Sequence, residues 1–214
     1  MEVLAASTDE DERYEAAKYL ADHPDTHAIG ALAIALCTGD EFVRFWAAHA
    51  LGVTQHPDAV LPLCGALRDI ESDVRDAAAD ALAEVADERA VQPLMRAFLR
   101  EGLGRNALVR IGQPSVTALL AALEAKAHLV GHRIVLVEAL AEIADPRVGP
   151  ALLGILHDGN EPAEVRQTAG ECVTDLDDGK YYAEAMKALE LLSWMQDDDP
   201  FKHDWVDDDE DEVE

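Results

Sequence analysis

The chain has 214 residues and a formal net charge of −27, with 17 Lys and Arg against 44 Asp and Glu. Binding to nucleic-acid phosphates needs a footprint of Lys and Arg, and the sequence has no basic stripe, which argues against direct nucleic-acid binding. No apolar run approaches the ~18 residues of a membrane span, and the N-terminus lacks the basic start of a signal peptide. We therefore expect a cytoplasmic protein that does not bind membranes.

Apolar residues recur at helical spacing along the chain, in pairs of segments that are separated by short polar turns. In the clearest pair, Val74, Ala78 and Leu82 lie on one face of a helix, and a second apolar stripe runs from Val91 to Leu99 beyond an acidic turn. This spacing predicts two amphipathic helices that pack against each other as a helical hairpin.

The same hairpin occurs six times along the chain, and such self-similarity is the signature of a repeat array. The last large apolar residue before each turn marks the copies, which are Leu20, Leu51, Leu82, Leu108, Leu140 and Val173, at intervals of 31, 31, 26, 32 and 33 residues. Five copies have an arginine seven residues before this mark: Arg13, Arg44, Arg75, Arg133 and Arg166. We expect these guanidinium groups to hydrogen-bond carboxylates or helix ends of neighbouring repeats.

The fourth copy is the short one, and it has Glu101 at the position of the arginine. Gly102 and Gly104 are expected to make a tight connection there, with local distortion. Prolines near the start of three second helices should lie in the first turn, because a deeper proline would remove an internal hydrogen bond; they are Pro62, Pro93 and Pro150.

Neither a linker nor a composition break interrupts the chain before Gln196, so we expect one domain over residues 1–196. Residues 197–214 hold 11 acids and one lysine, a composition that predicts a mostly disordered acidic tail. Phe201 and Trp205 lie four residues apart in it, a spacing that would present both rings on one turn of an induced helix. The alternative is a solvated tail whose role is solubility.

Three segments resemble the HEAT repeats of the phycobilisome-lyase type: VRFWAAHALGVTQHPDAVLPLCGAL, DVRDAAADALAEVADERAVQPLMRAF and HRIVLVEALAEIADPRVGPALLGIL. The resemblance covers roughly residues 8 to 194. It implies an all-α fold, an α-solenoid of about six HEAT-like helical hairpins, with first helices outside and second helices lining the concave side. Proteins that resemble this pattern include chromophore lyases, an iron-dependent hydroxylase and scaffolds, so the resemblance is specific for architecture rather than activity.

Catalytic and metal sites have little support in the sequence. The hydroxylase of the resembling group uses His-Glu pairs, and none of the eight histidines here is followed by glutamate, so that activity is not carried over. The three cysteines, Cys37, Cys64 and Cys172, form an odd set on predicted helices, which indicates reduced thiols buried as small apolar groups. We expect no metal and no cofactor.

The acidic surface has two interpretations. With five lysines, twelve arginines and many aspartates, the chain resembles proteins adapted to high intracellular salt, in which counterions screen the carboxylates. The competing interpretation is an acidic module that binds a basic protein.

The second helices carry almost no charge on the side that faces away from their core stripe. This row includes Ile34, Leu61, Gln92, Arg96, Thr117 and Leu153. Two explanations fit this row: extra packing between repeats, or a groove for an apolar peptide, helix or flat ligand. We expect a non-enzymatic, monomeric scaffold that binds a protein partner through this row. The alternative is a bilin lyase-like subunit or another small-molecule-binding HEAT protein.

Overall fold

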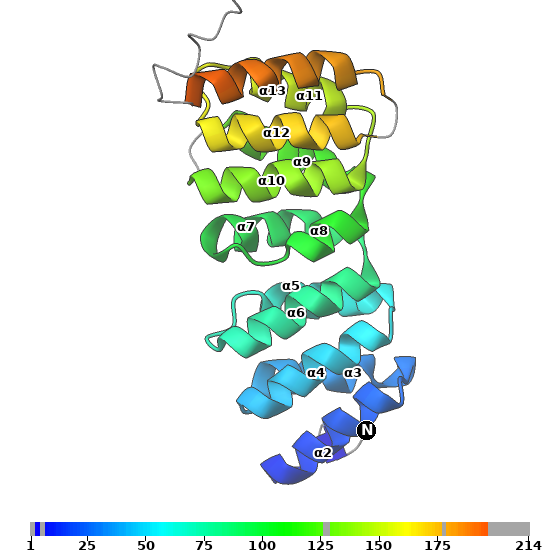
Figure 1. Cartoon of the computed structure of the whole chain (residues 1–214). Helices are drawn as coiled ribbons and strands as arrows, with labels where there is room; N and C mark the ends of the chain where they lie inside the picture. The colour runs from blue at the N-terminus through cyan, green and yellow to red at the C-terminus, as the bar shows by residue number, and fades with distance from the viewer. Residues whose placement is uncertain (1–2, 5–6, 126–128, 177–178, 197–214) are drawn as a thin grey trace, which may run out of the picture.

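The computed structural model describes residues 3–4, 7–125, 129–176 and 179–196. Within them, twelve α-helices stack as six antiparallel hairpins in a single column, so that each hairpin contacts mainly its neighbours along the chain (Figure 1). The described residues contain no strand. This confirms the α-solenoid of about six hairpins.

Each hairpin has a first helix and a second helix, with the first helices toward the viewer in Figure 1. The first helices are α2 (Glu10–Asp22), α4 (Glu41–Val53), α6 (Ser72–Val85), α8 (Arg105–Ile111), α10 (Val130–Ile143) and α12 (Ala163–Asp175). The second helices are α3 (Ile29–Thr38), α5 (Val60–Ala66), α7 (Val91–Glu101), α9 (Gln113–Glu124), α11 (Val148–His157) and α13 (Tyr182–Gln196). Short 3₁₀ turns precede three second helices: η1 (Thr26–Ala28), η2 (Pro57–Ala59) and η3 (Glu88–Ala90).

Local chemistry sets the helix ends. Asp9 caps α2 by accepting hydrogen bonds from the backbone of Asp11 and Glu12, and Asp40 caps α4 by accepting from the Val43 backbone. Helices α6 and α10 end at left-handed residues, Ala86 and Ala144, which turn the chain back toward the next helix.

The predicted positions of the prolines and of two glycines are confirmed. Pro62, Pro93 and Pro150 are each the third residue of their helix, where no internal hydrogen bond is lost. Gly102 and Gly104 adopt φ angles of +77° and +89°, which favour glycine, and they form the tight connection into α8. Helix α8 has only seven residues, so the fourth hairpin is the distorted one.

The core runs continuously between the two layers of helices. The stripe residues Val74, Ala78 and Leu82 are fully buried, as is Leu94 of the opposite stripe, while Phe98 is 2% exposed. One cluster of buried apolar residues extends from the first hairpin to the last. The array is therefore held together by burial between successive repeats, as expected for a solenoid.

The first helices pack closely along the array, and the second helices contact one another much less. At the α4–α6 contact, a Cβ on Gly52 would lie 2.7 Å from the Ala81 Cα, so small residues bring these backbones together. The inner layer of a curved array is the more tightly spaced one. The expectation that the second helices line the concave side is therefore wrong, and we refer below to the first-helix face and the second-helix face.

None of the described helices is long and apolar enough to span a membrane. The predicted acidic tail, with Phe201 and Trp205, lies outside the described residues. The boundary at 196 thus stays a prediction.

Candidate protein-interaction surface

The arginines that open the first helices form a ladder along the array. Arg44 donates to both carboxylate oxygens of Asp69, at 2.7 and 2.8 Å, and to the Gly39 carbonyl at 2.9 Å. Arg133 makes the same paired contact with Glu161, at 3.0 and 2.7 Å, and both of these side chains are 4% exposed. Paired guanidinium–carboxylate bonds of this kind fix geometry as well as contributing energy.

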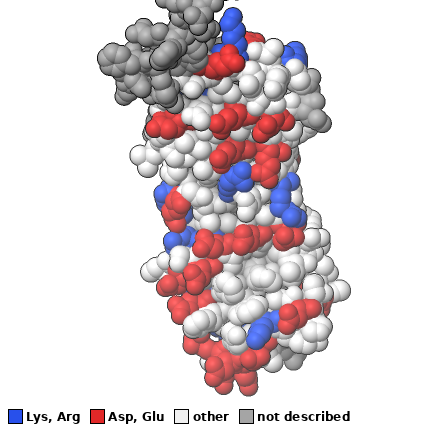
Figure 2. All heavy atoms as spheres, in the orientation of Figure 1, with Lys and Arg blue, Asp and Glu red and all other residues white. Residues whose placement is uncertain are grey.

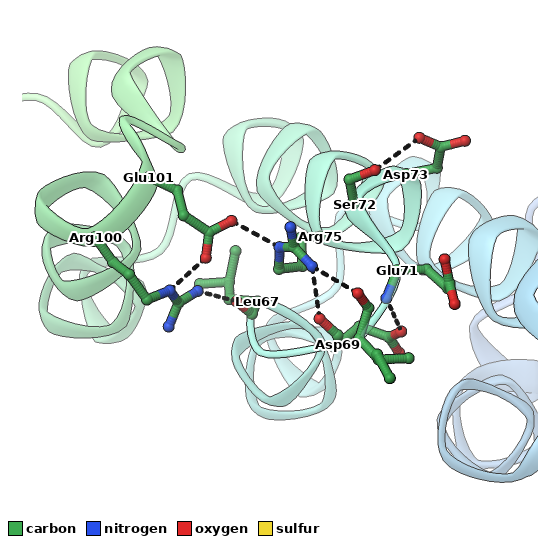
Figure 3. A network of polar contacts seen from close by, with 9 residues as sticks. Leu67, Asp69, Glu71, Ser72, Asp73, Arg75, Arg100 and Glu101 are labelled. Atoms are coloured by element: carbon green, nitrogen blue, oxygen red, sulfur yellow. Dashed lines mark hydrogen bonds and ion pairs between the residues drawn. The ribbon is translucent and has the colours of Figure 1, made fainter.

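Arg75 continues the ladder at the third hairpin (Figure 3). It donates to Glu101 at 2.8 Å and to the Asp69 carbonyl at 2.8 Å. Glu101 also accepts from Arg100, which donates to the Leu67 carbonyl at 2.9 Å. The glutamate that replaces arginine in the short copy therefore serves as an acceptor for the arginine of the preceding copy.

The terminal copies keep this pattern with fewer bonds. Arg13 donates to the Thr38 hydroxyl at 2.9 Å, and Arg166 donates to the Leu156 carbonyl at 2.9 Å. The prediction that the arginine series bonds carboxylates or helix ends of neighbouring repeats is confirmed in four copies, whereas Arg13 bonds a hydroxyl within its own hairpin.

The effect of the ladder on a carboxyl pKa is clearest at Asp69. Its partial burial would by itself raise the pKa of the carboxyl group. Hydrogen bonds from the Arg44 side chain and the Glu71 backbone outweigh that effect and lower the pKa below the ordinary value. Asp69 is thus a structural carboxylate, charged throughout the neutral range.

A second set of arginines ties the second helices together at their N-terminal ends. Arg89 donates to the Pro57 carbonyl at 2.7 Å, one repeat earlier. Arg147 donates to the Gln113 carbonyl at 3.3 Å and to the Thr117 hydroxyl at 3.1 Å. One member of the predicted binding row, Thr117, therefore has a structural contact of its own.

The structure divides the predicted row. Five of its members lie exposed on the second-helix face, namely Ile34, Leu61, Gln92, Arg96 and Thr117. Ile34 is 52% exposed and Leu61 is 71% exposed, large values for branched apolar side chains. These two residues therefore do not pack between repeats.

Leu153 departs from the row, because it is 8% exposed and belongs to the core. Its helical neighbour Gly149 faces inward as well, since a Cβ there would lie 2.5 Å from the Tyr181 ring. Helix α11 is thus rotated relative to the other second helices, and Gly154 takes the exposed position. Leu153 is not available to a partner, and its assignment to the surface row is corrected.

Two hollows extend the row across the middle repeats. One of about 480 Å³ lies between α3 and α5 and is lined by Leu36, Cys37, Arg44, Pro62, Gly65, Ala66, Arg68, Asp69 and Ile70. Ile70 beside it is 84% exposed. The other, of about 110 Å³, lies between α5 and α7 and is lined by Cys64, Gly65, Leu67, Arg68, Pro93, Arg96, Ala97 and Arg100. The two hollows therefore combine exposed apolar groups with four arginines, Arg44, Arg68, Arg96 and Arg100.

The first-helix face carries a larger hollow that the sequence interpretation did not include. It measures about 630 Å³ and is lined by Phe45, His49, Gly52, Val53, Asp73, Asp76, Ala77, Asp80, Ala81, Ala83, Glu84, Asn106 and Arg110. Figure 2 shows carboxylates in rows across this face. The i, i+3, i+7 and i+11 spacing of the four acids on α6 was the available signal. Asn106 and Arg110 of α8 line the hollow beside them.

The cysteines differ from the expectation in one case. Cys37 is exposed, because it lies one turn beyond Ile34 on the outer side of α3, whereas Cys64 and Cys172 are half-buried. Burial raises the pKa of both half-buried thiols to about 11. Among the described residues, no three His, Cys, Asp or Glu side chains gather in a way that would hold a metal ion.

Comparisons with known proteins agree with this architecture. A model of HEAT repeats matches residues 1–75, and a model of the PBS lyase HEAT-like repeat matches residues 74–100. A comparison with curated protein sequences gave no significant match.

Among solved structures, the complex of CpcE and CpcF of phycocyanin lyase from a Nostoc species matches at 19% identity and a TM-score of 0.52, over 89% of this chain and 92% of that chain. Human deoxyhypusine hydroxylase matches at 17% identity and a TM-score of 0.37, over 91% of this chain and 93% of that chain. A designed armadillo repeat protein matches at 19% identity and a TM-score of 0.43, over 88% and 97%. At these identities, the first match supports the fold alone.

The six stacked hairpins, the arginine ladder that joins them and the two family matches lead to one conclusion: the chain is a HEAT-repeat protein that includes a repeat of the PBS lyase HEAT-like type.

Proposed function

We propose that the protein is a non-enzymatic interaction scaffold whose second-helix face binds a partner protein. The observation that carries the proposal is the exposure of Ile34 and Leu61, at 52% and 71%, on neighbouring helices of a chain with a net charge of −27. Exposed apolar groups that cluster on one face are typical of interaction sites.

The side chains of the second-helix face indicate which kind of partner would bind there. The apolar side chains and the hollow beside Ile70 suit a segment that buries its own apolar residues there. Arg96 lies on the same face, one repeat further along, and its guanidinium has no ion pair within the described part of the chain. We therefore propose a partner segment that presents apolar side chains next to a carboxylate.

A pair of matched variants tests this role. Leu61→Asp changes the second-helix face, and Phe42→Asp changes an apolar side chain of similar exposure, 58%, on α4 of the other layer. The free energy of unfolding of both variants should lie within about 0.5 kcal/mol of the wild-type value, as is usual for surface substitutions. Affinity capture from the native host at its own salt concentration should lose its partner with Leu61→Asp and Arg96→Ala, and keep it with Phe42→Asp.

Leu153→Asp serves as the unfolding control, since it would place an unpaired charge in the core and cost several kcal/mol, roughly 3 or more. If Leu61→Asp and Arg96→Ala both fold normally and still capture every recovered partner, the second-helix face is not the docking surface.

A second candidate function is that of a lyase-like, small-molecule-binding subunit. Its support is the 630 Å³ hollow on the first-helix face, which falls in the roughly 300–1,000 Å³ range of ligand pockets. Incubation with a bilin separates the two candidates cheaply. A shifted visible absorbance that Asp76→Asn and Asp80→Asn weaken would favour the ligand-binding role, and an unchanged spectrum would favour the scaffold.

A further inference from the structure

Three arginines converge on the small hollow between α5 and α7. Arg68 lies in the turn after α5, and Arg96 and Arg100 lie four residues apart on α7, so that they share a helix face. The other lining residues are apolar or small, and no carboxylate lines the hollow. This is a local excess of positive charge in a strongly acidic protein.

Hydrogen bonds hold two of the three guanidinium groups, those of Arg96 and Arg100, and only Arg100 forms an ion pair with a described residue. Arg100 is anchored by the Leu67 carbonyl, at 2.9 Å, and by Glu101. Arg96 donates through its Nε to the Gln92 carbonyl at 3.2 Å and forms no ion pair with a described residue. The Arg68 side chain forms neither a hydrogen bond nor an ion pair with any residue that the structure describes, and only its backbone N–H is bonded, to the Gly65 carbonyl at 3.1 Å. The hollow is thus arranged to receive an anionic group.

We propose that this hollow binds an acidic peptide segment, and that its occupant is the acidic run at residues 207–212 of the same chain. Residues 197–214 carry 11 acids and one lysine, so their charge complements the arginines. Guanidinium–carboxylate hydrogen bonds would join the two.

The length of the chain after α13 fits this contact. Helix α13 is a second helix like α7, and Figure 1 shows that its C-terminal end lies at the same edge of the array as the α5–α6 turn. The arginines lie near that edge. Three to four helix spacings of about 10 Å separate α13 from the hollow between α5 and α7, so the distance is roughly 30–40 Å along the array. An extended chain covers about 36 Å from Gln196 to Asp207 and about 53 Å from Gln196 to Glu212, so the acidic run reaches the hollow.

Tethering makes the contact effective even though each exposed ion pair is weak. A segment joined by a short linker acts at an effective concentration of about millimolar. Salt screens such pairs, so the contact should hold at low salt and open at molar salt. Because Arg96 also belongs to the proposed docking row, a bound tail would compete there with an acidic partner.

Arginine footprinting on the full chain tests the contact without any partner. Phenylglyoxal modifies accessible guanidinium groups, and peptide mass spectrometry gives the rate at each site. The variant in which the six acids at 207–212 are replaced by their amides should expose Arg68 and Arg96 and raise their modification rates by at least about threefold at low salt. The rate at Arg89, which belongs to the other edge of the array, should not change.

Carbodiimide cross-linking supplies the second measurement. Arg68→Lys places an amine beside the hollow, and a zero-length cross-link to residues 207–212 is expected in the monomeric fraction. Arg89→Lys is the matched control and should give little of that product. In about 1 M KCl the Arg68→Lys product should disappear.

Equal modification rates with and without the acids at 207–212, together with no cross-link from position 68, would overturn the inference. Cross-links confined to a dimeric fraction would also overturn it, since they would assign the occupant to a second copy. The proposed function is tested by partner capture, so either result can fail while the other holds.

Discussion

The arginine ladder makes a quantitative prediction about stability, and Arg44→Met is the change that tests it. Arg44 donates two bonds to Asp69, at 2.7 and 2.8 Å, and one to the Gly39 carbonyl, at 2.9 Å. The two side chains are 17% and 11% exposed, so water replaces these bonds poorly. Methionine keeps most of the side-chain length and removes all three donors.

The magnitude follows from this burial. Breaking a buried pair by removing one partner costs about 3–5 kcal/mol, and the residual exposure of this pair places it near the lower limit, at about 3 kcal/mol. For a domain of 150–250 residues, each kcal/mol lowers the Tm by about 2–4 °C, so the expected fall is about 6–12 °C. Thermal unfolding followed by circular dichroism measures it.

Two further variants control for this explanation. In Arg44→Met combined with Asp69→Leu both charges are gone, and most of the lost stability should return, because a buried pair and an apolar pair of similar volume differ little. Glu84→Gln weakens an exposed contact, at 3.5 Å from Arg110, and should cost less than about 1 kcal/mol. A Tm for Arg44→Met within about 2 °C of the wild type would refute the structural role of the ladder.

The contribution of Asp69 to the stability of the fold should change with pH in a defined direction. The pKa of Asp69 is lower in the folded protein than its ordinary value of 3.8, because hydrogen bonds from Arg44 and the Glu71 backbone outweigh the burial that would raise it. The stabilisation from Asp69 is therefore complete above the unfolded pKa and is lost as the pH falls through the folded pKa. The Tm difference between the wild type and Asp69→Asn should be constant near neutral pH and shrink below about pH 3.8. A constant difference into strong acid would contradict this assignment.

Three other predictions concern packing, thiols and salt. Gly52→Ala should lower the free energy of unfolding by about 1–3 kcal/mol, because its Cβ would lie 2.7 Å from the Ala81 backbone. Gly30→Ala has open space and should be neutral or stabilising. Equal melting curves for the two variants would show that the close approach of α4 and α6 is unimportant. Iodoacetamide should modify exposed Cys37 first, and the modification of Cys64 should accelerate steeply as the pH approaches its pKa of about 11. Mass spectrometry measures both rates, and equal rates for Cys64 and Cys37 at neutral pH would contradict this prediction. The Tm should rise from low to molar KCl, because the Debye length falls from ~30 Å at 0.01 M to ~3 Å at 1 M and the repulsion between carboxylates falls with it. A flat or falling Tm would contradict the adaptation to high salt and would favour binding of a basic partner.

Periodicity within the sequence determined the repeat architecture. The apolar stripe around Leu82 and its resumption at Val91 were enough to predict a hairpin, because a helix that buries one face must place apolar residues at intervals of three and four. Glycines at 102 and 104 identified the tight connection, because the left-handed backbone region is open to glycine at little cost. These properties depend on neighbours in the chain, which the sequence displays directly.

Only the tertiary structure decided which surfaces are available. Ile34 and Leu153 occupy the same position in their repeats, yet one is 52% exposed and the other 8%, because α11 is rotated until Gly149 meets Tyr181. The carboxylate partners of the arginine ladder, the hollow beside α8 and the meeting of Arg68 with Arg96 likewise depend on contacts between repeats. Helical periodicity fixes which side of a helix is apolar, whereas the rotation and spacing of adjacent helices follow from side-chain packing between residues far apart in the chain.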